Sequence, residues 1–403
     1  MFAPTKCFDI AEACTNTERH PETVWMILSK LMVSFMPAAR AIEEPGASQR
    51  NDYLFIDNAR FVSMIAIVMR HCELSLFRDY HVSTLENAIT QVRSFGVLLF
   101  FVNSAFLMAA WLARPNTGVQ SYWRGRLNLV AKPWLIWATA YQVIGLVKFF
   151  SGDEGRVSGL PYQIWKNVFL DNYWFVPILF FSLAVILPLR RYWRSRWLGA
   201  VLLILSYFYG VNQYYQWFPP SHTTAVFGYL FYLWLGVQLF QHFTTERASV
   251  RRIPWWVVLM VLCFAISLMI VEDEISILRG FPNYYNALQI SNQLYALVVL
   301  VVLIKLPATV RLMPSFIDVR KESYGIYLTH PIVGSVGRAA IDFAVGRSNS
   351  GKSFFTRLPE MVENPFARIG IWVLWFGVVY TVSLVITKAL RRTTWAWTVG
   401  GKD

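Results

Sequence analysis

The chain has 403 residues, of which 56% are hydrophobic and only 15% are charged, and its formal net charge is +13. A soluble domain carries about 25% charged residues, so this composition excludes an ordinary soluble fold. The four cysteines show no paired spacing, which argues against a disulfide framework and against a metal site. The apolar residues form long uncharged blocks, and about 20 such residues suffice to cross a bilayer.

In lipid, each segment must satisfy its own backbone polar groups, so every span should be helical. The sequence therefore predicts an all-α polytopic membrane helix bundle with about ten transmembrane helices. We expect them near residues 53–72, 95–112, 128–149, 172–189, 197–215, 224–242, 254–271, 290–306, 323–344 and 367–388. Residues 1–52 are interpreted as an N-terminal extension and linker that holds an interfacial helix, residues 53–390 as the transmembrane domain, and residues 391–403 as a cytoplasmic basic tail.

The basic residues are distributed unevenly between the two sets of loops. One set, together with the tail, contains eighteen Lys and Arg residues, whereas the alternate set contains nine. The positive-inside rule then places both termini in the cytoplasm. The positive charge is thus explained by topology, with the lipid bilayer as partner, and we expect no nucleic-acid binding.

Polar residues interrupt the first span at Asp57, Arg60, Arg70 and His71. Arg60 and His71 are eleven residues apart, which is about three helical turns, so both project from one face with ~16 Å between them along the axis. Ionisable residues inside a membrane are candidate functional residues. The alternative is that each side chain extends to the nearer membrane surface.

Three further segments carry polar residues. The second span contains Asn103, Ser104 and Ala105, and small residues favour close approach of helices. Arg124 and Arg126 precede the third span, where they could bind phosphate oxygens or serve as ordinary positive-inside anchors. The ninth span aligns Ser323, Tyr327 and His330 on one face, just before Pro331. A functional histidine and a histidine that only bonds a neighbour both fit this spacing.

These segments resemble the acyltransferase-3 family of bacterial membrane proteins, which acylate surface carbohydrates. Asp57-Asn-Ala-Arg60 followed by His71 resembles the first-span motif of the family. Phe100-Phe101-Val-Asn-Ser104-Ala105-Phe106 resembles its second-span signature, with Ala105 in place of glycine. Five motifs occur in the family's order, and the other three are Arg126 with Pro133, Trp174-Phe175-Val176-Pro177, and Tyr324-Gly325-Ile326-Tyr327-Leu328-Thr329-His330-Pro331. At the second arginine position of the third span this chain has Leu129.

The resemblance implies an enzyme in the bacterial inner membrane that transfers an acyl group from cytoplasmic acyl-CoA to a carbohydrate hydroxyl. Acetyl is the first expectation for that group, succinyl is the alternative, and no tightly bound cofactor or metal is expected. His71 would be the general base or a transient acyl carrier, and Arg60 would support the donor or the oxyanion. Arg124 and Arg126 would bind the nucleotide phosphates, while Ser104, Tyr327 and His330 would line the donor tunnel.

Two features leave alternatives open. The uncharged aromatic segment at 214–222, which ends at His222, suits the faces of sugar rings, but it also suits an interfacial aromatic belt. A transporter or flippase for a glycan or small molecule would share the ten spans and their membrane histidine and arginine residues. It would not account for the spacing of Arg60 and His71 together with a cytoplasmic arginine pair.

Overall fold

The computed structural model describes residues 53–72, 89, 91–150, 159–169, 171–281, 286–345, 362 and 364–401. These described residues form helices and contain no strand, which confirms the all-α prediction. The predicted extension at 1–52 lies outside the described residues.

The α-helices follow the expected order along the chain. They are α2 (Leu54–His71), α4 (Gly96–Leu112), α5 (Val119–Arg126), α6 (Lys132–Phe150), α7 (Leu160–Phe169), α8 (Phe175–Ile186), α9 (Arg196–Tyr215), α10 (Leu230–Gln241), α11 (Phe243–Arg252), α12 (Trp255–Leu278), α13 (Ile290–Lys305), α14 (Val319–Val345) and α16 (Pro365–Arg391). A π-helical turn, η4 (Leu127–Ala131), joins α5 to α6, and short 3-10 turns are η5 (Pro188–Tyr192), η6 (His222–Thr224), η7 (Val226–Tyr229) and η8 (Ala396–Val399).

Each predicted span coincides with one of these helices, and α5, α7 and α11 lie between spans. In the part of the chain that the structure describes, two helices are by themselves long and apolar enough to cross a membrane, namely α12 and α16. Both expose large apolar side chains, such as Met260 and Phe264 on α12 and Leu374 on α16. The number of ten crossings and the cytoplasmic position of both termini stay predictions.

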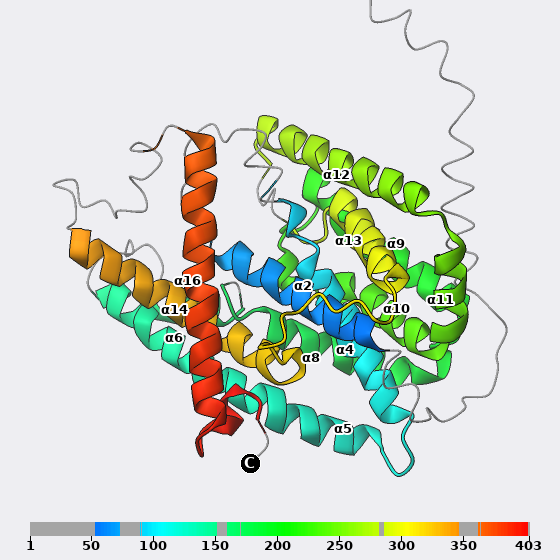
Figure 1. The fold of residues 1–403 in the computed structure, drawn as a ribbon, viewed down its shortest axis with the longest axis horizontal. Coiled ribbons are helices and arrows are strands. Elements are labelled where there is room, and N and C mark those ends of the chain that lie inside the picture. The colour runs from blue at the N-terminus through cyan, green and yellow to red at the C-terminus, as the bar shows by residue number, and fades with distance from the viewer. Residues whose placement is uncertain are drawn as a thin grey trace, which may run out of the picture.

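Helix α10 is an interior helix that packs against α4, α8 and α9 (Figure 1). Every residue from Leu230 to Leu239 on this helix is buried. The closest approach between helices occurs at Gly236, where an added Cβ would lie 2.2 Å from the Val102 carbonyl oxygen and 2.9 Å from the Ala105 Cβ. The small residues of the second and sixth spans therefore let α4 and α10 pack backbone against backbone, as the sequence predicts for Ala105.

Helices α2 and α14 cross the other part of the bundle side by side, and α16 packs across α14 (Figure 1). The end of the chain also belongs to this part. In η8, Val399 is fully buried, and the Trp137 indole donates a hydrogen bond of 2.8 Å to the Thr398 carbonyl oxygen. The segment expected to form a basic tail thus packs against α6 and α14 as far as Gly401.

We expect Gly236→Ala to lower the unfolding temperature of the detergent-solubilised protein, because the new methyl group would displace the α4 backbone. Overpacking of this kind costs about 1–3 kcal/mol. Gly377→Ala on α16 is the matched control, since no described atom lies within 4 Å of a Cβ there. The control should be neutral or stabilise by up to about 1 kcal/mol. Tryptophan fluorescence during heating measures the unfolding temperatures of both variants. Equal unfolding temperatures for Gly236→Ala and Gly377→Ala would contradict the close packing of α4 on α10.

Candidate active site

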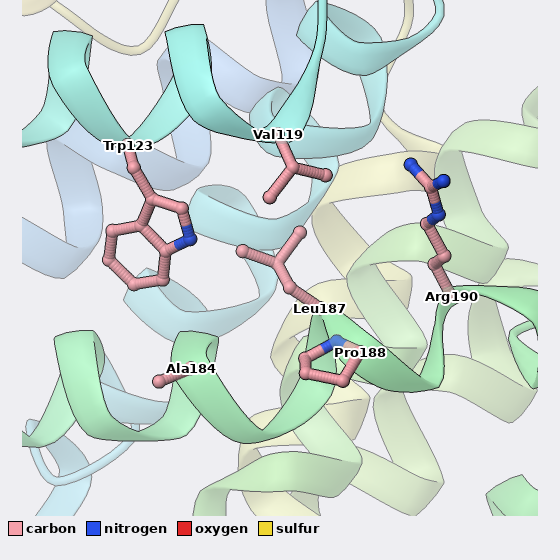
Figure 2. A pocket seen from close by; sticks show the side chains of 6 residues that line it. All are labelled: Val119, Trp123, Ala184, Leu187, Pro188 and Arg190. Carbon is pink, nitrogen blue, oxygen red and sulfur yellow. The ribbon is translucent and has the colours of Figure 1, made fainter.

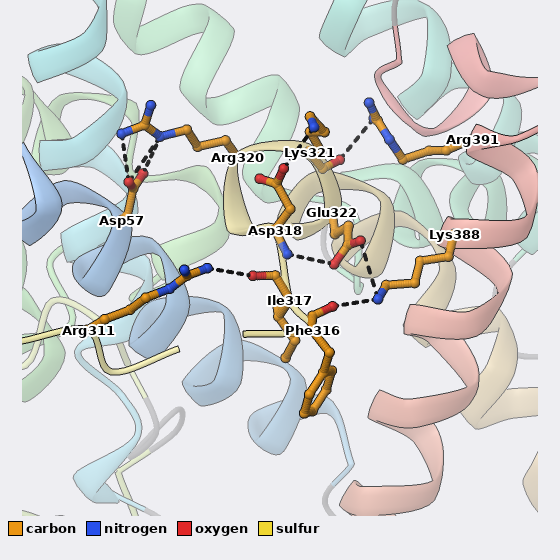
Figure 3. Close-up of polar contacts among 10 residues, drawn as sticks. All are labelled: Asp57, Arg311, Phe316, Ile317, Asp318, Arg320, Lys321, Glu322, Lys388 and Arg391. Atoms are coloured by element: carbon orange, nitrogen blue, oxygen red, sulfur yellow. Dashed lines mark hydrogen bonds and ion pairs between the residues drawn. The ribbon is translucent and has the colours of Figure 1, made fainter. Parts of the chain in front are cut away.

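An ion pair joins the beginnings of α2 and α14. The Arg320 Nε donates to both carboxylate oxygens of Asp57 at 2.9 Å, and its second nitrogen lies 2.8 Å from Oδ2 (Figure 3). Asp57 is buried, whereas the Arg320 side chain is 55% exposed. The Arg60 guanidinium, one helical turn after Asp57, interacts electrostatically with Asp57, Arg126 and Arg320. We call Arg60, Arg126 and Arg320 the cationic cluster.

A second group of polar contacts holds the beginning of α14 against the end of α16 (Figure 3). The Glu322 carboxylate accepts a hydrogen bond of 3.0 Å from the Asp318 backbone N–H and lies 3.7 Å from the Lys388 Nζ. Arg391 donates to the Lys321 carbonyl oxygen at 3.0 Å. These contacts fix the orientation of the turn that carries Arg320, so the cationic cluster is built on a rigid base.

The structure places Arg126, but not Arg124, beside the cationic cluster. Arg126 ends α5 and lies over the ring of Tyr122, with 5.1 Å between its Cζ and the ring centroid. Burial raises the pKa of the Tyr122 hydroxyl, and the charge of Arg126 opposes that rise. Residues two positions apart on an α-helix are rotated by about 200° around the helix axis. Arg124 therefore points away from Arg126, and it is exposed. The two arginines of the predicted cradle therefore do not act on one site.

The segment after Arg126 is a π-helical turn, a feature that occurs frequently at functional sites. The Tyr324 hydroxyl donates to the Val130 carbonyl oxygen of this turn at 2.6 Å. Tyr324 comes from α14, so the turn is tied to the same helix as Arg320. The Leu129 carbonyl oxygen faces Gly400 of the C-terminal segment.

A cavity of about 360 Å³ opens between α5 and the end of α8 (Figure 2). Val119 and Trp123 line it from α5, and Leu187, Pro188 and Arg190 line it from the opposite side. The lining is apolar except for Arg190. Since Trp123 and Arg126 belong to the same short helix, this cavity lies on an element that also contributes to the cationic cluster.

At the other end of α2, His71 meets His330 of α14. Their ring centroids are 5.2 Å apart. The His330 Nδ1 lies 3.1 Å from the Ile326 carbonyl oxygen, which can only accept, so Nδ1 carries the proton and Nε2 presents a lone pair. His330 is 1% exposed, and its Nε2 has no hydrogen-bond partner among the described residues. A buried lone pair of this kind is ready to accept a proton from a bound hydroxyl.

The segment before α8 orients His71. The Asn172 side chain forms a hydrogen bond with the His71 ring. The Asn172 amide nitrogen also donates to the Tyr141 hydroxyl at 2.7 Å, and Tyr141 in turn donates to the Asp171 carboxylate at 2.9 Å. Because the Asn172 amide nitrogen donates to Tyr141, the Asn172 amide oxygen is the atom that faces an N–H of His71. Such a contact selects one tautomer of the ring and fixes its direction.

Tyr327 lies next to the histidine pair. Its ring centroid is 5.9 Å from that of His330, and its hydroxyl lies 3.4 Å from the Asn172 carbonyl oxygen. Phe175 packs edge-on against both Tyr327 and Phe100. Ser104 follows Phe100 by one helical turn, so it lies on the same side of α4, where it is half-buried. The predicted tunnel residues therefore lie along the side of the bundle between α4, α8 and α14.

A third histidine lies close to this pair. The His222 ring meets Trp174 edge-on, with 5.1 Å between centroids, and interacts electrostatically with Arg70. Burial lowers the pKa of His222 to about 3, so this imidazole is neutral at physiological pH. His222 thus brings the aromatic 214–222 segment to the same end of the bundle as His71.

Sequence reasoning missed Asn172, Arg320 and Arg338. Asn172 directly precedes the Tyr173-Trp174-Phe175 motif, but an uncharged amide carries no signal of its own. Arg320 was counted only as a loop charge. Arg338 lies inside the predicted ninth span, where any ionisable residue is a candidate functional residue, so this signal was present in the sequence.

Comparison with known proteins identifies the family of this chain. The family model described as an acyltransferase domain, that of the acyltransferase-3 family, matches residues 53–392. The chain therefore belongs to the acyltransferase-3 family, a family of membrane acyltransferases, as the sequence resemblance predicted. No curated protein and no solved structure matches the chain at a significant level.

We expect Asp57→Asn to destabilise the protein more than Arg320→Gln. Arg320 is half exposed, so Arg320→Gln should lower the free energy of unfolding by about 1 kcal/mol or less. Loss of the Asp57 charge leaves Arg320 and Arg60 without their shared counter-ion and should lower the free energy of unfolding by about 3 kcal/mol. Raising NaCl from 0.1 to 1 M shortens the screening length from about 10 Å to about 3 Å. It should therefore narrow the difference in stability between the two variants. Thermal unfolding at both salt concentrations tests this, and a larger loss for Arg320→Gln would contradict the shared role of Asp57.

Proposed function

We propose that this acyltransferase is a multi-pass protein of the bacterial inner membrane that moves an acyl group from cytoplasmic acyl-CoA to a hydroxyl of a cell-surface or periplasmic carbohydrate. Acetyl is the first expectation for the group, and succinyl is the alternative. The proposal rests on one observation above all. Helix α2 carries Arg60, within the cationic cluster, and His71, within a histidine pair, on one face and ~16 Å apart.

The cationic cluster is suited to the phosphates of the donor. Guanidinium groups bind phosphate oxygens through paired N–H donors. Here Asp57 pairs with Arg320 and interacts with Arg60, and the charge of Arg126 acts on Arg60 as well. The cluster therefore has positive charge that Asp57 does not balance. Because of its distance from His71, Arg60 would bind the donor rather than the oxyanion. The Trp123 cavity lies beside the cluster and could accept an apolar part of the same donor.

The histidine pair supplies the chemistry. His71 takes the proton of the acceptor hydroxyl while the hydroxyl oxygen attacks the thioester carbon. The tetrahedral intermediate then collapses, the carbon–sulfur bond breaks, and the imidazolium returns its proton to the leaving thiolate. Asn172 holds the His71 ring in position during both steps. The Nε2 lone pair of His330 accepts a hydrogen bond from a second hydroxyl of the carbohydrate and so orients the acceptor.

Release of CoA from acyl-CoA by the purified protein tests this function directly. A thiol reagent measures free CoA in detergent micelles, where no transmembrane gradient exists. Release that depends on added carbohydrate supports acyl transfer. The complete absence of release with both acetyl-CoA and succinyl-CoA, from a folded protein and across several glycans, would count against the proposal and favour a transport role.

His71→Ala should lower kcat/KM for acyl transfer by about a hundredfold or more, because a positioned general base contributes 10²–10⁴-fold. His330→Ala should also lower it, and Asn172→Ala should lower kcat while leaving the donor KM unchanged, since Asn172 acts through His71. His242→Gln, at the junction of α10 and α11, is the control histidine variant. If His71→Ala keeps near-normal transfer in folded protein, His71 is not the base.

Arg126→Gln should raise the donor KM by about ten- to a hundredfold, which corresponds to one lost charge-assisted hydrogen bond. Arg124→Gln is the matched control, because Arg124 lies on the same helix but points away from Arg60. Its donor KM should change little, and high salt should weaken donor binding by wild type more than by Arg126→Gln. An unchanged donor KM in folded Arg126→Gln would mean that Arg126 acts only as a membrane anchor.

A further inference from the structure

An arginine that the proposed reaction does not use lies close to the histidine pair. The charge of Arg338, on α14, acts on His71, on Cys72 and on Tyr141 of α6. Its terminal nitrogen is 3.9 Å from the position that a Cβ on Gly334 would occupy. The side chain therefore runs back along α14 towards His330, whereas an arginine that extends to the membrane surface would point away from it.

The space in front of Gly334 is open although Gly334 itself is buried. Apart from the Arg338 nitrogen, no described atom of another element lies within 4 Å of a Cβ placed there. At Gly337, by contrast, an added Cβ would lie 2.7 Å from the Trp375 ring, so the space there is filled. Gly334 follows His330 by one helical turn, so the open space adjoins the buried, unpartnered Nε2 of His330.

The polar groups around this space are predominantly cationic or neutral. Arg338 has no hydrogen bond or ion pair within the described part of the chain, and Arg70 adds a second positive charge that also acts on His71. Two acids lie nearby: Asp171, whose carboxylate accepts the Tyr141 hydrogen bond, and Asp342, which follows Arg338 by one helical turn. Arg338 is half-buried, and a guanidinium held partly away from water without a partner favours an anionic ligand.

We propose that the space beside Gly334, between Arg338 and the His71–His330 pair, is a subsite for a carboxylate of the substrate. The proposal rests on the proposed function, because it places that carboxylate next to the reacting groups. The paired donors of a guanidinium match the two oxygens of a carboxylate. The carboxylate has two possible sources, the far end of a dicarboxylic acyl group such as succinyl, or an acidic sugar of the acceptor.

Equilibrium binding tests the subsite without any turnover. The probes are two matched pairs, succinyl-CoA with acetyl-CoA and trigalacturonic acid with galactotriose, and titration calorimetry on protein in detergent gives each dissociation constant. Wild type should bind the anionic member of at least one pair about tenfold or more tightly than the neutral member. A preference within the donor pair assigns the carboxylate to the acyl group, and a preference within the sugar pair assigns it to the acceptor.

Arg338→Gln should abolish that preference without weakening the neutral probes, and Arg338→Lys should retain part of it. Arg279→Gln, an exposed arginine just after α12, is the control and should behave as wild type. Lack of any preference in wild type, or a preference that survives in folded Arg338→Gln, would overturn the subsite. A failure of the proposed function is recognised separately, since it abolishes CoA release and leaves these dissociation constants unaffected.

Discussion

Two contacts between α2 and α14 determine where every other functional residue lies. The Asp57–Arg320 ion pair joins the beginnings of the two helices, and the His71–His330 ring contact joins them about fourteen residues further along α2. Because both helices run in the same direction, their polar residues collect into two groups at opposite ends of one helix pair. A substrate that reaches both groups must therefore lie lengthwise along α2.

The two groups differ in their electrostatics. The cationic cluster combines three guanidinium groups with the carboxylates of Asp57 and Asp318 beside Arg320, and it is kept in position by contacts among Glu322, Lys388 and Arg391. The histidine pair lies among aromatic rings and a short chain of hydrogen bonds that runs from Asn172 through Tyr141 to the Asp171 carboxylate. One end is thus suited to hold charge, and the other is suited to move a proton in surroundings from which water is largely excluded.

The sequence predicted the helical fold, the order of the helices and the pairing of Arg60 with His71 on one face, because hydropathy and helical periodicity act locally. Contacts between distant segments were harder to predict. Nothing near Asn172 in the sequence reveals that it faces His71, since that contact depends on how α8 packs against α2. The cradle of Arg124 and Arg126 was predicted from proximity along the chain, but the helical rotation between the two residues separates their side chains. Arg320 was likewise recognisable only once α14 was packed beside α2.

The packed C-terminal segment also bears on where the domain ends. The family match stops at residue 392, yet Val399 is fully buried and Thr398 accepts the hydrogen bond of Trp137. The same segment brings Gly400 against Tyr324 and against the π-helical turn that follows Arg126. Residues beyond the family boundary therefore pack against α6 and α14 and support the π-helical turn before α6. A protein shortened at the family boundary would keep every residue of the two polar groups and lose the support that sets the position of one of them.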